Sequence, residues 1–457
     1  MMRLSEAAVA TQGQLRGQDF EFTGVSTDSR SVQPGDLFVA LRGERYDGHV
    51  YAEECLNKGA AAVLVDEPAT AVTPALQVAD TRLALGKLAA YWRSKFDIPF
   101  AAITGSNGKT TVKEMLASIL RAATGKDELV LSTQGNFNND IGLPLTLLRL
   151  RHEHRFAVVE MGMNHEGEIS YLTRLATPTV ALVNNATLAH LGGLGSVEAI
   201  ARAKGEIFEG LAESGTAIIN ADDAFADFWR KLAAPRKVMT FGLKDNADVN
   251  VVYKLGADDS QLTLRTPDGN IEVLLPAAGL HNVSNALAAT AAALSMHIPL
   301  PLIAHGLAAF GGVKGRLQRK PGFNRALILD DTYNANPASM KAAIDVLAAR
   351  TGTRLLVLGD MGELGEDAAK LHAEIGRYAK EAGIEGFYTL GDLSREMAKA
   401  FGPGANHYET VELLAFDLKV RMNTSTTVLV KGSRFMRMER VVSLIGAEQK
   451  EGSDNAA

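Results

Sequence analysis

The chain has little of what marks exported and membrane proteins. Its 457 residues include one cysteine, Cys55, so no intrachain disulfide can form, and this usage is typical of a reducing compartment. No window reaches the length of a membrane span without charges, and residues 1–11 lack the long apolar core of a signal peptide. The sequence therefore predicts a cytoplasmic protein without membrane insertion.

An excess of positive charge is also missing. The 47 Lys and Arg residues and 53 Asp and Glu residues give a net charge of −6, so nucleic acid is not the expected partner. A hydrophobic content of 46% and a charged content of 22% are those of a soluble globular protein. At ~150 residues per domain, the length predicts about three domains.

The order of apolar runs and helical patterns predicts an α/β protein with three domains. Residues 1–81 contain short strands and turns and are expected to form a small α/β module. Residues 82–312 are expected to form a doubly wound sheet with a hairpin near 266–270. Its predicted buried strands, each followed by polar residues, lie at 156–159, 180–183 and 217–219.

Residues 313–457 repeat the alternation of strands and helices. The predicted strands lie at 326–329, 355–358, 387–390 and 428–430. A Rossmann-like sheet is therefore expected. It has no G-x-G-x-x-G after its first strand, and this disfavours a dinucleotide role.

The most informative segment is a glycine-rich turn between a predicted strand at 100–104 and a predicted helix. One face of that helix is apolar and consists of Val112, Met115, Leu116, Ile119 and Leu120. The turn consists of Gly105, Ser106, Asn107, Gly108, Lys109, Thr110 and Thr111. Unpaired backbone N–H groups and the helix dipole favour phosphate at such a turn, Lys109 supplies a mobile cation, and the Thr110 hydroxyl can bind Mg²⁺. The first glycine of the common P-loop pattern is replaced by Ile103, so the loop is a shortened variant. The alternative is a turn that only caps a helix.

Three further residues are candidates for metal binding and catalysis. Glu160 ends an apolar run, so its carboxylate is expected to point toward the phosphate loop and to bind Mg²⁺, although it could be an ordinary polar residue at a strand end. His190 lies in a glycine-rich loop, where a histidine is usually just solvated. Lys204 lies in a predicted helix over 197–211 and, from the sequence alone, is expected on the surface. Lys109 is likewise expected in a solvated loop.

With these residues in this order, the chain resembles the Mur ligase family of ATP-dependent amide-bond-forming enzymes, whose phosphate loop has this shortened form. Four segments are similar to the member that adds D-alanyl-D-alanine to UDP-N-acetylmuramoyl-tripeptide: 136–144, 160–165, 279–286 and 330–337. The resemblance covers the whole chain apart from its tail. It implies a cytoplasmic ligase of peptidoglycan precursor synthesis, expected to be a monomer, with ATP and Mg²⁺ as cofactors.

The resemblance also implies residue roles. Lys109, His190 and a carbamylated Lys204 would be catalytic, and the metal ligands would be Thr110, Glu160, His190 and Lys204. ATP would be bound by the phosphate loop 105–111 and by His281, Asn285, Arg316 and Asp331, with Asp330 an open alternative to Asp331. Substrate contacts would come from Ser29, Arg30, Gly43, Asp47, His49, Asn136, Asn138, Asn139, Asn334, Asn336, Lys431, Ser433 and Arg434. Asp360 and Glu363 are further candidates near the incoming dipeptide.

Three alternatives stay open at this point. The nearest is another ligase with the same ATPase, which adds a single amino acid to a UDP-muramoyl substrate or glutamate to folate. A P-loop kinase or regulatory NTPase would need neither the N-terminal module nor the third sheet. A non-catalytic UDP-sugar binder would leave Lys109, Thr110 and Glu160 without a purpose. The sequence does not identify the third residue of the tripeptide.

Overall fold

A computed structural model describes residues 1–66, 72–187 and 194–447. The first sheet has five strands in the order β2-β9-β8-β5-β4 and is parallel except for β2. Its strands are β2 (Gln14–Arg16), β4 (Gly24–Ser26), β5 (Asp36–Val39), β8 (Ala62–Val65) and β9 (Ala75–Gln77). Helices α1 (Leu4–Thr11) and α2 (Ala52–Asn57) accompany it, together with the small ladders β1–β3 (Met2–Arg3, Glu21–Phe22) and β6–β7 (Arg42–Gly43, Tyr46–Asp47).

Helix α3 (Thr81–Arg93) connects this module to the centre of the molecule. Asp80 caps it by accepting a hydrogen bond from the N–H of Leu83, which is the local reason that the helix begins there. At Gly86 a Cβ would lie 2.0 Å from the hydroxyl oxygen of Tyr171, so α3 packs closely against helix α6 (Glu168–Ala176). One hydrophobic core runs through α3 from the first sheet into the second.

The central sheet is parallel throughout, with the strand order β11-β12-β10-β13-β14-β15. Its strands are β10 (Phe100–Thr104), β11 (Val130–Ser132), β12 (Phe156–Glu160), β13 (Val180–Val183), β14 (Thr216–Asn220) and β15 (Lys237–Phe241). After β10 the chain first runs to one side of the sheet and then, from β12, crosses to the other side. The carboxyl end of β10 is therefore a topological switch point, where ligands bind in such sheets.

Helices cover both faces of the central sheet. The covering helices are α4 (Lys109–Thr124), α5 (Gly142–Leu147), α6, α8 (Val197–Gly205), α9 (Ala226–Ala233), α10 (Leu280–Ser295) and α11 (Leu300–Ala308). The predicted apolar face of α4 is confirmed, because Val112, Met115, Leu116, Ile119 and Leu120 are all fully buried. The predicted hairpin is confirmed too: β17 (Ser260–Thr266) and β18 (Gly269–Leu275) pair around it, and β16 (Asn250–Leu255) completes a three-stranded sheet.

The third sheet has the order β19-β20-β24-β21-β22-β23 and is parallel except for β19. Its strands are β19 (Gln318–Pro321), β20 (Leu327–Asp331), β21 (Thr353–Gly359), β22 (Gly386–Leu390), β23 (Ala405–Tyr408) and β24 (Thr426–Lys431). Its helices are α12 (Pro337–Ala348), α13 (Ala368–Glu381), α14 (Ser394–Phe401), α15 (Val411–Arg421) and α16 (Glu439–Ile445). All four strands predicted after residue 313 are present, and the three-domain α/β fold is confirmed.

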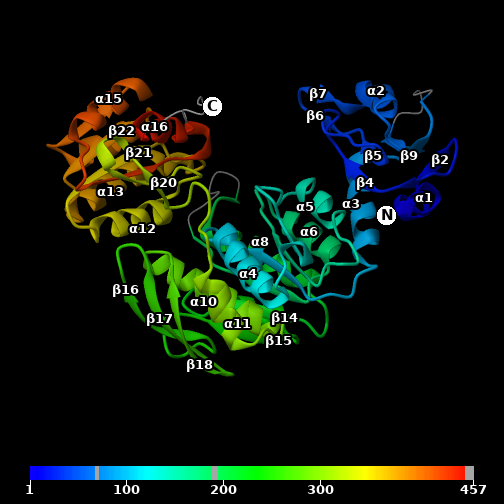
Figure 1. The fold of residues 1–457 in the computed structure, drawn as a ribbon, viewed down its shortest axis with the longest axis horizontal. Helices are drawn as coiled ribbons and strands as arrows, with labels where there is room; N and C mark the ends of the chain where they lie inside the picture. Colours follow the sequence, from blue (N-terminus) through cyan, green and yellow to red (C-terminus); the bar gives the residue numbers. More distant parts are fainter. Residues whose placement is uncertain (67–71, 188–193, 448–457) are drawn as a thin grey trace, which may run out of the picture.

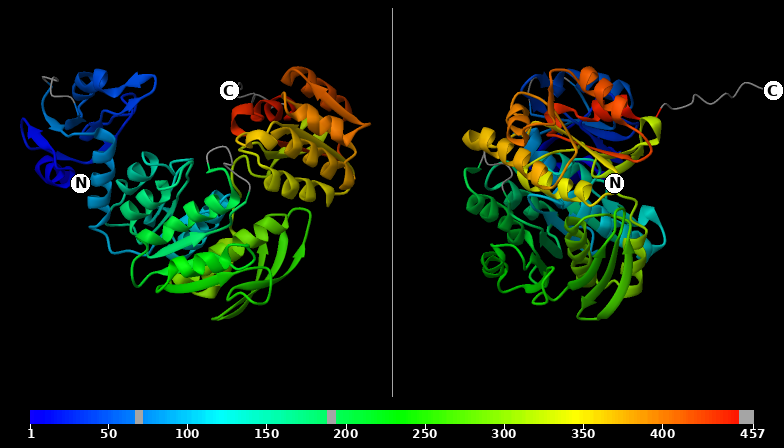
Figure 2. Two further views of the ribbon diagram at one scale, coloured as in Figure 1. Left: turned by 180° about the vertical axis from the view of Figure 1, so that it is seen from behind. Right: turned by 90° about the vertical axis from the view of Figure 1, so that its left-hand side faces the viewer.

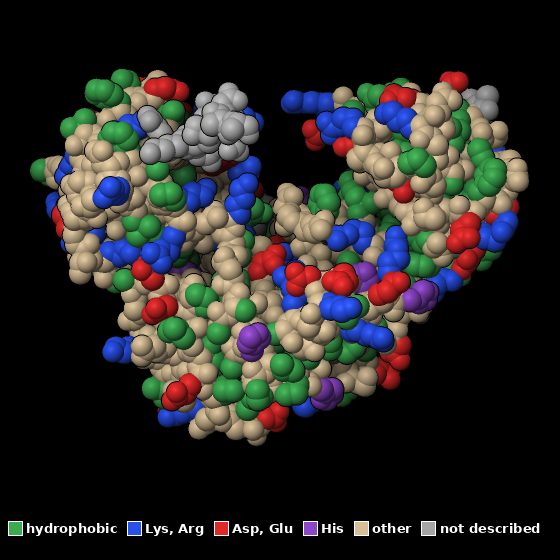
Figure 3. All heavy atoms as spheres, in the orientation of Figure 1, with side chains coloured by type: hydrophobic (Ala, Val, Ile, Leu, Met, Phe, Trp, Pro, Cys, Tyr) green, Lys and Arg blue, Asp and Glu red, His purple; other side chains and the backbone are tan. Residues whose placement is uncertain are grey.

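The N-terminal module, the central part and the C-terminal part form an open, arched molecule. The first module and the third sheet rise as two arms on either side of the central part (Figures 1 and 2). Figure 3 shows a hollow between the arms. Within the described residues, no helix is long and apolar enough to cross a lipid bilayer. The sheets occupy residues 14–77, 100–275 and 318–431, and the exact division at 81 and 312 stays a prediction.

Candidate active site

The glycine-rich turn joins β10 to α4, as the sequence predicted. Gly108, with φ of 80°, is the residue before the first helical residue, Lys109. A Cβ there would lie 2.3 Å from Oδ1 of Asn285 and 2.5 Å from Nδ2 of Asn184, so the position requires glycine for space as well as for conformation. The turn lies at the N-terminus of a helix, where free backbone N–H groups and the helix dipole favour phosphate binding.

Two asparagines at the end of β13 brace this turn. Asn185 accepts hydrogen bonds from the backbone N–H groups of Ser106 (2.9 Å, to its carbonyl) and Asn107 (2.8 Å, to Oδ1). Asn184 donates from Nδ2 to the carbonyl oxygen of Asn107 at 2.9 Å. The sequence marked both asparagines as the polar end of a buried strand but gave them no role. Because β13 lies next to β10, they fix the shape of the loop.

Glu160 and Thr110 meet as predicted. The Thr110 hydroxyl donates to Oε2 of Glu160 at 2.8 Å, and Nδ2 of Asn138 donates to Oε1 at 2.8 Å. Glu160 is 3% exposed and Thr110 is 8% exposed. A buried carboxylate beside a hydroxyl is the hard-oxygen donor set that Mg²⁺ prefers, with phosphate oxygens completing its shell. The residues present therefore fit one Mg²⁺ ion.

Lys109 is more buried than the sequence suggested. Its ammonium donates to the carbonyl oxygen of Gly105 at 2.6 Å and folds back over the loop. Burial lowers its pKa, while the nearby Glu160 carboxylate opposes that effect. The expectation of a solvated loop residue was wrong, because Lys109 is the first residue of α4 and its side chain lies against the turn rather than in water.

The surface position expected for Lys204 was also wrong. Lys204 is 2% exposed near the end of α8, which gives way to a 3-10 turn after Gly205 instead of continuing to 211. Burial, with a smaller effect from the charge of Lys109, lowers its pKa well below the ordinary value. His190 lies outside the described residues.

Two cavities meet at the phosphate loop. The larger has a volume of about 1090 Å³ and reaches from the Asn-rich loop to the third sheet, and the smaller, of about 600 Å³, lies between α10 and α12. The residues that line both are Asn107, Gly108, Arg316, Asp331, Ser339 and Lys431. A molecule that extends from one cavity into the other must therefore pass the loop.

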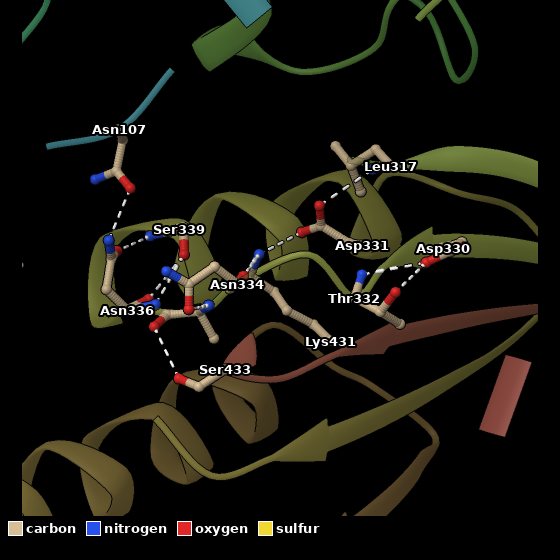
Figure 4. Close-up of polar contacts among 11 residues, drawn as sticks. Asn107, Leu317, Asp330, Asp331, Thr332, Asn334, Asn336, Ser339, Lys431 and Ser433 are labelled. Carbon is tan, nitrogen blue, oxygen red and sulfur yellow. Dashed lines mark hydrogen bonds and ion pairs between the residues drawn. The ribbon is translucent and has the colours of Figure 1, made fainter. Parts of the chain in front are cut away.

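The third sheet contributes directly to this junction. Asn336 donates from Nδ2 to Oδ1 of Asn107 at 2.7 Å (Figure 4). Arg316 donates from Nη2 to the Thr110 hydroxyl at 2.8 Å, and its guanidinium stacks over the ring of Tyr333 at 4.4 Å. The site is thus assembled from two domains, which a local motif could not reveal.

The strand alternation distinguishes the two aspartates that the sequence left open. Asp331 lines both cavities and accepts a hydrogen bond from Nζ of Lys431 at 2.6 Å. Asp330 points away, pairing with Lys320 at 2.6 Å and accepting a hydrogen bond from the Thr332 hydroxyl (Figure 4). Side chains alternate between the faces of a strand, so only one of the two can face the ligand. The geometry favours Asp331.

Several other predicted residues line a cavity. His281 and Asn285, at the start of α10, line the smaller one, and burial lowers the pKa of His281 so that its imidazole is neutral near pH 7. The larger one is lined by Asn136, Asn138, Asn139, Asn334, Asn336, Glu363, Lys431, Ser433 and Arg434. Asp360 is not among its lining residues, and its carboxylate instead accepts the N–H groups of Leu393 and Ser394.

The structure does not bring the N-terminal candidates to either cavity. Arg30 is exposed and pairs with Asp28, which lowers the pKa of that carboxyl to about 2. His49 is buried between the carboxylates of Asp47 (2.6 Å) and Asp66 (3.1 Å). Ser29 and Gly43 line neither cavity. All of these lie at the carboxyl end of β4 and β5, on the arm that faces the central part across the opening.

Comparison with known proteins covers the whole fold. Three family models match: the Mur ligase family catalytic domain at residues 21–93, the Mur ligase middle domain at 103–293, and the Mur ligase glutamate ligase domain at 315–434. The chain is 44% identical to the UDP-N-acetylmuramoyl-tripeptide–D-alanyl-D-alanine ligase of Escherichia coli K12, over 96% of this chain and 97% of that one. The corresponding ligase of Haemophilus influenzae is 42% identical, over 97% and 98%.

Solved structures of similar proteins have the same fold. MurF from Acinetobacter baumannii has a TM-score of 0.89 at 38% identity, covering 96% of this chain and 97% of that one. MurF ligase from Thermotoga maritima in complex with ADP has a TM-score of 0.82 at 28% identity, covering 94% and 98%.

Proposed function

The chain belongs to the Mur ligase family, and from this membership we propose that it joins D-alanyl-D-alanine to UDP-N-acetylmuramoyl-tripeptide at the expense of ATP. The reaction releases ADP and phosphate and belongs to peptidoglycan precursor synthesis. Full-length similarity to ligases of that name, at 44% and 42% identity, supports this substrate pair over a folate or single-amino-acid ligase. The enzyme acts in the cytoplasm, as a monomer.

The observation that carries the proposal is the position of the phosphate loop between two cavities. The smaller cavity, with His281 and Asn285, takes the adenosine of ATP, and Asp331 and Arg316 contact the nucleotide from the third domain. The larger one takes the end of the tripeptide beside Asn136, Asn138 and Asn139. It also takes the dipeptide beside Lys431, Ser433 and Arg434. The γ-phosphoryl group then lies where the two meet.

The chemistry follows from the weak electrophilicity of a carboxylate. An oxygen of the tripeptide carboxylate attacks the γ-phosphorus, and the bond to the ADP oxygen breaks, giving an acyl phosphate. The amine of D-alanyl-D-alanine attacks the acyl carbon, phosphate leaves, and the nitrogen loses a proton. Lys109 neutralises charge on the oxygens of the transferred phosphoryl group. Electrostatic stabilisation of this kind provides most of the catalysis of phosphoryl transfer.

Thr110 and Glu160 would hold one Mg²⁺ ion, and a carbamylated Lys204 with His190 would hold a second. Bound there, Mg²⁺ neutralises phosphate charge and aligns the triphosphate. For Lys204 the buried amine supports the proposal, because a lowered pKa leaves more of it neutral and able to add to CO₂. The addition forms an N–C bond, releases a proton and converts a cation into an oxygen ligand.

The N-terminal arm binds the uridine diphosphate, with Ser29, Arg30, Gly43, Asp47 and His49 as its contacts. Since these residues stand outside the larger cavity, the substrate must span the opening between the arm and the phosphate loop. Asn334 and Asn336, from the loop before α12, contact substrate from the opposite side. Closure of the arms around it would exclude water, which otherwise hydrolyses the acyl phosphate.

Phosphate release from a panel of UDP-linked muramoyl peptides tests this function. We expect ADP and phosphate only when a UDP-N-acetylmuramoyl-tripeptide, D-alanyl-D-alanine and Mg²⁺–ATP are all present. Single amino acids in place of the dipeptide serve as the control for the nearest alternative. Equal turnover with a single amino acid, or with no UDP-linked acid, would contradict the proposal.

Replacing Glu160 with glutamine should raise the Mg²⁺ concentration needed for half-maximal activity by about tenfold or more, because an amide is a much weaker ligand than a carboxylate. The amide can still accept the Thr110 hydrogen bond, so the loop should keep its shape. The measurement is a Mg²⁺ titration of initial rate at saturating ATP. A matched control is Glu168→Gln, which removes a carboxylate from the same cavity wall away from Thr110. An unchanged Mg²⁺ requirement in Glu160→Gln would remove the ligand assignment.

A further inference from the structure

One ion pair on the wall of the larger cavity has no part in the chemistry above. Arg82, near the start of α3, donates from Nη2 to Oδ1 of Asp140 at 2.8 Å, and its Nε donates to Oδ2. The guanidinium therefore grips the carboxylate with two parallel hydrogen bonds. The side chains are 56% and 34% exposed, and pairs exposed to this degree contribute little to stability. They are open to a ligand.

The pair lies a short distance from the place where the tripeptide carboxylate is activated. Asp140 follows Asn138 by two residues, a span of at most about 7 Å. Asn138 in turn donates to Glu160 at 2.8 Å. The loop between them is fixed, because Oδ1 of Asn139 accepts the N–H of Gly142 at 2.9 Å. A side chain that leaves the carbon next to the activated carboxylate can reach the pair from there.

The pair presents a cation and an anion side by side. A complementary ligand therefore carries a carboxylate and an ammonium group close together. We propose that Arg82 and Asp140 determine specificity for the third residue of the tripeptide by binding a zwitterionic amino-acid group at the end of its side chain. Nη1 of Arg82, which is not used in the two hydrogen bonds to Asp140, donates to the ligand carboxylate, and the Asp140 carboxylate accepts from the ligand ammonium. A 2,6-diaminopimelate side chain ends in such a group. This assignment rests on the proposed function.

A side chain that ends in an ammonium alone, as lysine does, fits this wall less well. Its charge would compete with Arg82 for Asp140 and would leave the guanidinium without a new partner. Asp80, the neighbouring carboxylate, does not replace Asp140, because it caps α3 through the N–H of Leu83 at 2.9 Å. The positive end of the helix dipole offsets the charge of Asp80. The hydroxyl of Tyr171 adds a neutral polar group nearby.

The test compares two UDP-N-acetylmuramoyl-tripeptides, one ending in diaminopimelate and one in lysine, in the wild type and two variants. The wild type should prefer the diaminopimelate substrate in kcat/KM by about tenfold or more, the effect of one charge-assisted contact. Arg82→Met should raise the KM for that substrate by about tenfold to a hundredfold and leave the KM for the lysine substrate within twofold. Asp140→Asn should raise both. The KM values for ATP and D-alanyl-D-alanine should stay unchanged.

The matched control is Arg174→Met, which breaks a similarly exposed pair between Arg174 on α6 and Glu209, neither of which lines the cavity. It should leave the substrate preference unchanged. An Arg82→Met enzyme that loses affinity equally for both tripeptides would overturn the assignment, and so would a wild type with no preference. A wild type that releases no phosphate with either tripeptide would instead overturn the proposed function.

Discussion

Replacing Lys109 with methionine should lower the rate of acyl phosphate formation by about a thousandfold while the chain stays folded. Lys109 is the cation of the phosphate loop, and removing one preorganised donor to a transferring group costs two to three orders of magnitude in kcat. Methionine keeps most of the volume of this partly buried side chain, so the loss of rate measures the effect of removing the positive charge. Single-turnover trapping of the acyl phosphate measures the step directly.

The fold should tolerate this change. The hydrogen bond from the ammonium to the carbonyl oxygen of Gly105, at 2.6 Å, contributes about 1 kcal/mol, which corresponds to a shift of about 2 to 4 °C in the midpoint of thermal unfolding. The loop is still held by Asn184 and Asn185. Lys109→Arg is the second variant, since it keeps the charge in a bulkier form and should recover part of the activity. Normal turnover of Lys109→Met would refute the role of this lysine.

Replacing Lys204 with alanine should also inactivate the enzyme, and short carboxylic acids should partly restore its activity. An added acetate or formate can occupy the space of the missing side chain and supply the oxygen ligand that the proposed carbamate would provide. Activity of the wild type should fall when CO₂ and bicarbonate are removed, and ¹³C-bicarbonate should give a carbamate signal by NMR. Lowering the pH through the pKa of the amine should abolish both the activity and the carbamate signal, because the ammonium does not add to CO₂.

Two controls separate this role from packing. Lys204→Met fills the buried site without an amine, so it should be as inactive as Lys204→Ala but more stable to heat. Arg202→Ala, an exposed residue on the same helix, should keep its activity and its independence of added acids. Full activity of Lys204→Met without bicarbonate would remove the carbamate from the mechanism.

Local sequence patterns predicted the structure correctly where the conformation of a segment depends on its own residues. The strand at 100–104, the turn and the apolar face of the following helix are set by contiguous residues, and all were predicted correctly. The hairpin at 266–270 was predicted for the same reason, since its turn residues lie between alternating runs. The position of Glu160 beside Thr110 also followed, because neighbouring parallel strands end at the same edge of a sheet.

Burial was the property that local patterns did not give. Lys204 lies on a helix of mixed character, and a lysine there is usually exposed. Its burial depends on the packing of α8 against the rest of the central domain, which is not encoded within the helix. The same holds for Lys109, whose side chain turns back over the loop that precedes it. In both cases the pKa, and therefore the chemistry, depends on surroundings that come from distant segments.

By itself, the sequence determined the class of fold, the phosphate loop between a strand and a helix, and the resemblance to the Mur ligases, because each rests on residue patterns within contiguous segments of the chain. The tertiary structure alone decided that Asp331 rather than Asp330 lines the two cavities and that Asn336 and Arg316 reach the phosphate loop from another domain. It also decided that Arg82 and Asp140, 58 residues apart, form one charged site. The physical reason is that these contacts join segments that are far apart in the sequence. Such segments come together only when the chain packs into its tertiary structure.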